Sequence, residues 1–102
     1  MAASKVRETQ RHVTYEIDGG GSTPVICLHP NFEASYQLVR AGGADGTVSV
    51  QVTNDLEAND LQEIASEVSE VHAELPPASG LQFTVSGQTT GTHRIHVFSI
   101  ER

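Results

Sequence analysis

Five histidines give this sequence its broadest chemical capacity, because a neutral imidazole binds transition metals and moves protons near neutral pH. They are His12, His29, His72, His93 and His96. Their spacing argues against a metal site, since the chain has no pair of cysteines and no His-x-x-x-His sequence. His93 and His96 stand three apart in an expected strand and should therefore point to opposite faces. We expect no metal site and no cofactor.

Nucleophilic side chains lack the partners that catalysis requires. Ser22 and Thr23 follow three glycines, but this loop lacks the lysine that reaches phosphates in a P-loop, and no base is identifiable beside either hydroxyl. Cys27 is the only cysteine and falls in an apolar stretch, so we expect it in the core. We therefore expect no catalytic residue and no enzyme activity. An alternative hypothesis is a small histidine-dependent enzyme or metal protein, built on His29, His72, His93 or His96.

The acidic residues form the most distinctive pattern. The chain has no Lys or Arg between positions 41 and 93, while eight of its acidic residues lie there. In a helix, the spacing of Glu63, Glu67, Glu70 and Glu74 would align four like charges in one row, which is locally unfavourable. Such a row is explained by a solvated face or by a cationic partner. We predict that it binds a basic surface of a protein partner, through Asp60, Glu63, Glu67, Glu70 and Glu74.

Length and charge limit the other function classes. The chain has 102 residues, with 13 acidic residues against six Lys and Arg, for a net charge of −7. This balance opposes phosphate contacts, so we expect no direct binding of nucleic acid. No apolar stretch approaches the ~20 residues of a membrane helix, and a single cysteine suits a reducing compartment. We expect a soluble cytoplasmic protein with no membrane contact.

The first half of the chain predicts strands. Residues 1–10 are polar and are expected to form a flexible N-terminal tail, followed by a single α+β domain over 11–102. Val13, Tyr15 and Ile17 alternate with polar residues, and a short apolar run follows at 25–28. We expect these two strands to form a hairpin, with Tyr15 beside Cys27.

The second half predicts further strands and one helix. Alternating patterns indicate strands over 35–41, 47–53, 81–85 and 92–100. A helix is expected from about Asp60 to Leu75, because Asn59 and Gln62 form a capping box and Pro76 ends it. Its apolar stripe is Leu61, Ile64, Ala65, Val68, Val71 and Leu75. The predicted fold is α+β, with a mainly antiparallel sheet of about five to six strands and one amphipathic helix across a face.

These expectations lead to a small acidic interaction protein that is not an enzyme. An inhibitor, an antitoxin-like or immunity-like protein, or a viral protein directed against a host factor would carry such a face. The alternative is a subunit that assembles with itself, as a dimer or a larger assembly. It would use the last strand as a free edge, or a strip of small residues on the helix. That strip is Gln62, Ser66, Ser69 and Ala73.

Overall fold

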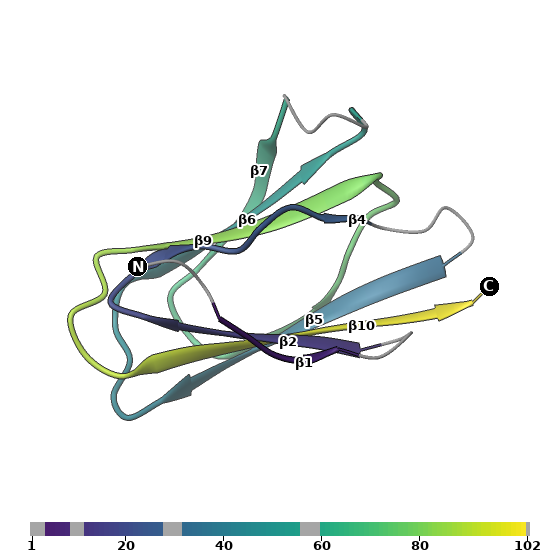
Figure 1. The fold of residues 1–102 in the computed structure, drawn as a ribbon. Helices are drawn as coiled ribbons and strands as arrows, with labels where there is room; N and C mark the ends of the chain where they lie inside the picture. The colour runs from purple at the N-terminus through teal and green to yellow at the C-terminus, as the bar shows by residue number, and fades with distance from the viewer. Residues whose placement is uncertain (1–3, 9–11, 28–31, 56–59, 102) are drawn as a thin grey trace.

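The computed structural model describes residues 4–8, 12–27, 32–55 and 60–101, and no helix occurs within these ranges. Ten strands form two antiparallel sheets that face each other (Figure 1). The strands are β1 (Ser4–Glu8), β2 (His12–Asp18), β3 (Gly21–Ser22), β4 (Ile26–Cys27), β5 (Phe32–Ala41), β6 (Thr47–Thr53), β7 (Gln62–Glu67), β8 (Val71–Glu74), β9 (Gly80–Ser86) and β10 (Thr92–Glu101). The fold is therefore all-β.

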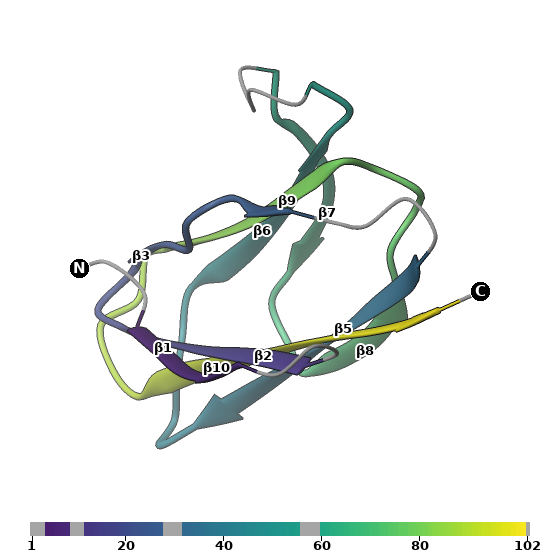
Figure 2. The same cartoon turned by 45° about the vertical axis from the view of Figure 1, so that its right-hand side comes forward.

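The order of the strands identifies the architecture. The first sheet has the order β1-β2-β10-β5-β8. The second has the order β3-β9-β6-β7, and β4 also pairs with β9. The chain passes from one layer to the other between β2 and β3, β4 and β5, β5 and β6, β7 and β8, and again on either side of β9 (Figure 2). Two facing antiparallel sheets connected in this way form a jelly roll, here with β1 added at one edge.

The core fills the space between the two sheets. Residues of one parity on each strand point into this space, as expected for sheets that are each exposed on one side. The buried apolar side chains are Val13, Tyr15, Ile17, Tyr36, Leu38, Val48, Val50, Leu81, Phe83, Val85, Ile95 and Val97. The rings of Tyr36 and Phe83 meet edge to face across the layers, with centroids 5.4 Å apart. The strands predicted over 35–41, 47–53, 81–85 and 92–100 are thus confirmed.

The predicted α+β fold and its helix over 60–75 are wrong. The segment instead forms β7, which pairs with β6, and β8, which pairs with β5. A helix would have buried Ile64 and Val68, whose exposed fractions are 42% and 67%. Val71 and Ala73 also alternate with polar residues, and this strand pattern packs against the core. Tertiary pairing therefore overrides a local helical periodicity. The expected cap residue Asn59 lies outside the described residues.

The predicted hairpin between 13–17 and 25–28 is also wrong. After β2, Gly19 and Gly20 adopt positive φ angles of 72° and 90°, which glycine accommodates without a side-chain clash. The chain then crosses to the other sheet, where Ile26 and Cys27 pair with Leu81 and Gly80 of β9. Cys27 is exposed there and is not the core residue that the sequence predicted.

Both ends of the chain pair within the first sheet. The segment predicted as a flexible tail contains β1, which runs antiparallel to β2. The last strand, β10, is not the free edge proposed for self-assembly, because β2 pairs with one side of it and β5 with the other. Within the described ranges, no helix is long and apolar enough to cross a membrane.

Two turns at one end of the sandwich are joined by Asp45. This residue lies between β5 and β6, and its carboxylate accepts hydrogen bonds from the backbone N–H groups of Thr89 and Thr90 at 2.7 and 3.0 Å. The Thr89 hydroxyl donates a third bond at 2.6 Å. These donors, with the Thr89 hydroxyl foremost, hold the pKa of Asp45 well below its ordinary value.

Asp45→Asn should therefore destabilise the fold in a pH-dependent manner. A carboxyl whose pKa is lowered by folding contributes stability above its unfolded pKa of about 4, and this contribution is lost as the pH falls further. We expect the variant to melt below the wild-type temperature at pH 7, with the difference narrowing below about pH 4. Thermal unfolding followed at pH 7 and pH 3 measures this. A difference that stays constant over the range would contradict the role given to Asp45.

Candidate functional site

The predicted acidic residues lie along one side of the sandwich. β7 is the last strand of the second sheet and β8 the last strand of the first, and residues 68–70 connect them. In the described residues β7 pairs only with β6, and β8 only with β5. The predicted partner-binding residues lie just before β7, in β7, in this connection and in β8. We call them the acidic edge: Asp60, Glu63, Glu67, Glu70 and Glu74.

The strand geometry divides the acidic edge instead of aligning it in one row. Asp60, Glu63, Glu70 and Glu74 are exposed, whereas Glu67 is half-buried. Glu63 lies on the outer face of the second sheet, where its carboxylate accepts a hydrogen bond from the Ser49 hydroxyl at 2.5 Å. Glu74 lies opposite Ser35 on the outer face of the first sheet. The structure thus places the five residues on one side of the molecule but facing different directions.

Two members of the acidic edge also tie the sheets together. The Tyr36 hydroxyl, on β5, donates a hydrogen bond to the Glu67 carboxylate on β7 at 2.9 Å. Burial, and then this bond and the charge of Glu67, raise the pKa of Tyr36 to about 12. The backbone N–H of Arg40 donates to the Glu70 carboxylate at 2.8 Å. Glu67 and Glu70 therefore have structural roles that the sequence did not reveal.

Exposed apolar side chains accompany these charges. Val50 of β6 pairs with Ala65 of β7, but the next residue, Gln51, pairs with Glu63. Ile64 is therefore the extra residue of a β-bulge. Ile64 is 42% exposed, and Val68, just after β7, is 67% exposed. Two exposed apolar residues therefore stand beside Glu63 and Glu67 along the chain, and the helical interpretation had placed both of them in the core.

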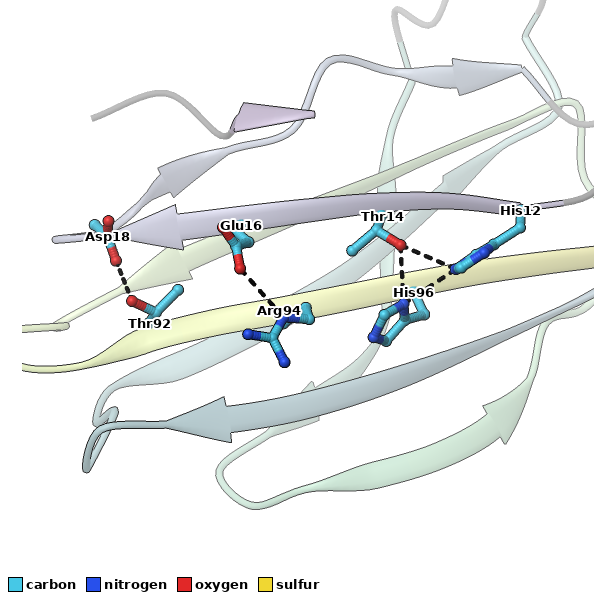
Figure 3. A network of polar contacts seen from close by, with 7 residues as sticks. All are labelled: His12, Thr14, Glu16, Asp18, Thr92, Arg94 and His96. Carbon is cyan, nitrogen blue, oxygen red and sulfur yellow. Dashed lines mark hydrogen bonds and ion pairs between the residues drawn. The ribbon is translucent and has the colours of Figure 1, made fainter. Parts of the chain in front are cut away.

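A second polar group, which the sequence did not reveal, lies on the outer face of the first sheet (Figure 3). The Thr14 hydroxyl oxygen lies 2.9 Å from His12 Nε2 and 2.9 Å from His96 Nδ1. The two imidazole nitrogens are 3.1 Å apart. We call His12, Thr14 and His96 the histidine triangle. Its residues come together because β2 pairs with β10, which places His96 directly beside Thr14.

Further polar pairs between β2 and β10 lie beside the histidine triangle. Arg94 Nε lies 3.2 Å from a carboxylate oxygen of Glu16, and the Thr92 hydroxyl donates to Asp18. The outward parity of His12, Thr14, Glu16 and Asp18 was visible in the sequence. What the sequence lacked was the pairing of the first long strand with the last, which are separated by more than 70 residues.

The histidine triangle opens onto a shallow depression of about 430 Å³. Its lining comes from four neighbouring strands and consists of His12, Ser35, Tyr36, Gln37, His72, His96 and Phe98. His72 lies two strands away from His96, with Gln37 between them. Among the described residues, no three His, Cys, Asp or Glu side chains gather as a metal-binding group.

The remaining histidines are placed differently. His93 is fully buried on the inner face, with Nε2 2.8 Å from the backbone oxygen of Asp45. His93 and His96 thus point to opposite faces, as the spacing predicted. His29 lies outside the described residues.

Comparison with known proteins adds information on the fold. Neither protein-family models nor curated protein sequences match this chain significantly. Among solved structures, PirA superposes with a TM-score of 0.57 at 13% identity, covering 93% of this chain and 98% of that one. A cupin domain from Bordetella pertussis Tohama I superposes with a TM-score of 0.50 at 11% identity, covering 96% and 91%. The likeness is one of fold. It agrees with the jelly-roll topology, since cupins belong to that architecture.

Proposed function

We propose that this chain is a non-enzymatic binding protein whose acidic edge binds a basic surface of a partner protein. The observation that carries the proposal is the exposure of Ile64 and Val68, which follow Glu63 and Glu67 in and just after β7, a strand that pairs only with β6 among the described residues. Exposed apolar residues bordered by polar ones are the usual composition of a protein interface. An inhibitor, an antitoxin-like or immunity-like protein, or a viral anti-host protein would use such a surface.

Strand addition gives this edge a physical mode of binding. An edge strand has backbone N–H and C=O groups that a partner segment can pair with, and natural proteins often protect such edges with lysine. No Lys or Arg occurs between positions 41 and 93, so the charged side chains of β7 are acidic and not basic. Acidic side chains repel a second copy of the same edge but attract a basic segment. The charge therefore favours a basic partner over self-association.

The test compares two variants that remove equal charge. Glu63→Gln with Glu74→Gln removes two of the five charges of the acidic edge and leaves Glu67 and Glu70 in their structural contacts. Glu16→Gln with Asp18→Asn removes two charges from β2, at the far side of the first sheet. The partner is captured at low salt from the source cells or their host, and association rates are measured by surface plasmon resonance. Steering by a charged surface contributes 10-fold or more to such rates, so we expect about a 10-fold loss in the edge variant.

The control variant should stay close to wild type, and added salt should slow the wild-type association more than that of the edge variant. Equal losses in both variants would mean that net charge, and not the acidic edge, carries binding. If the chain captures only copies of itself, self-assembly replaces the proposal.

A further inference from the structure

The histidine triangle has three donor atoms at mutually short distances. Its sides are 2.9, 2.9 and 3.1 Å, and they join one hydroxyl oxygen and two imidazole nitrogens. All three residues stand on two directly paired strands, and Thr14 is only 3% exposed. The arrangement is therefore held by regular backbone pairing and is not formed by a loop.

Hydrogen atoms can satisfy only two of these three contacts. An imidazole nitrogen either carries a hydrogen and donates, or presents its lone pair and accepts. The Thr14 hydroxyl supplies one hydrogen and one protonated nitrogen supplies a second. If both nitrogens facing the triangle are protonated, neither can accept a hydrogen bond from the other, and the contact between them is not satisfied. A single cation could instead accept a lone pair from all three atoms.

The spacing agrees with neighbouring positions of an octahedron. Two donors that each lie about 2.05 Å from a metal ion are about 2.9 Å apart at a right angle, and about 3.4 Å apart at the tetrahedral angle. The three observed distances lie closer to the first value. His12 and His96 also line the open depression of about 430 Å³, where water or another ligand has room.

We infer that His12, His96 and Thr14 form a binding site for one divalent transition-metal ion with six-coordinate preference, such as Ni²⁺ or Co²⁺. Imidazole nitrogens suit these ions, and their affinities generally exceed those of Mn²⁺ and Fe²⁺ at a given site. Thr14 is the weakest of the three ligands because an un-ionised hydroxyl oxygen is a poorer donor to these ions than an imidazole nitrogen. The site lies on the outer face of the sheet and is separate from the acidic edge.

The charged residues next along β2 and β10, Glu16 and Arg94, are paired with each other at 3.2 Å. His72 lines the same depression but lies two strands from His96, so it is a matched control histidine and not a ligand.

Titration calorimetry of the tag-free full chain with Ni²⁺ tests the inference at pH 7.5. We expect one equivalent to bind, and His12→Ala and His96→Ala each to weaken binding by more than about 10-fold. Even residues that only orient a metal ligand cost 10–100-fold when replaced. Thr14→Val should cause a smaller loss, and His72→Ala should stay within about twofold of wild type.

Circular dichroism of each variant establishes that it is folded before the comparison is made. The inference is overturned if the wild-type chain binds no Ni²⁺, or if both His12→Ala and His96→Ala keep the wild-type affinity. A loss in His72→Ala as large as theirs would overturn it too, because any surface histidine would then serve equally.

Discussion

Gly91→Ala should lower the free energy of unfolding by about 3 kcal/mol or more, the largest effect expected from a single added methyl group in this chain. Gly91 has a φ angle of +74°, which residues with a side chain rarely adopt. A Cβ atom there would overlap the Ala44 backbone nitrogen and stand 2.5 Å from the Ala41 backbone oxygen. The turn after β9 packs directly against the turn after β5 at this point. Urea denaturation measures the loss.

Gly43→Ala provides the matched control. Gly43 has nearly the same φ angle, +75°, but an added Cβ would meet nothing within 4 Å. Its expected cost is only the left-handed backbone term of about 1–2 kcal/mol. Equal losses in the two variants would contradict the close contact between the turns, and with it the arrangement of β5, β6, β9 and β10.

Phe83→Ala should cost about 3–5 kcal/mol of unfolding free energy, as removing a buried aromatic side chain leaves a cavity. Phe83 is 1% exposed and lies on the central strand β9 of the second sheet. Its ring contacts Tyr36 from the opposite sheet, so the substitution removes packing between the two layers. Urea denaturation measures this effect as well.

Phe98→Ala is the same substitution on an outward-facing side chain. Phe98 is 46% exposed on the outer face of the first sheet, and its replacement should cost less than about 1 kcal/mol. If Phe98→Ala proved as destabilising as Phe83→Ala, the assignment of inner and outer faces on β10 would be wrong.

The strands were predictable where apolar residues alternate over five or more positions. The alternation of Val48 with Val50, and of Leu81 with Phe83, predicts which face of each strand is buried. The structure buries all four side chains. In β10, Ile95 and Val97 have one parity and Phe98 the other. The structure buries Ile95 and Val97 and leaves Phe98 exposed on the other face. The pairing of β10 with β5 is continuous, with no bulge.

The segment 60–75 could not be predicted because it fits two periodicities. Leu61, Ile64, Val68 and Val71 follow a helix, whereas Val71 and Ala73 alternate as in a strand. Two neighbouring strands decide the outcome, since β6 and β5 each pair with part of this segment. Such long-range pairing is not encoded in local spacing.

The histidine triangle could not be predicted from the sequence for a related reason. His12 and His96 belong to different ends of the chain, and only the pairing of β2 with β10 brings them together. Each histidine had the correct outward parity, but parity does not specify a neighbouring strand. The acidic residues were predicted as one helical row, and only the structure shows their distribution over β7, β8 and the residues around these strands.

Site-specific photo-crosslinking tests the central claim of partner binding at the acidic edge most directly. A photoreactive phenylalanine replaces either Val68, which is 67% exposed beside β7, or Phe98, which is 46% exposed on the outer face of the first sheet. We predict that a basic partner protein crosslinks from position 68 and not from position 98, with a yield that falls as salt rises. A partner that crosslinks from position 98 and not from position 68 would contradict the claim and place binding on the outer face of the first sheet, away from β7.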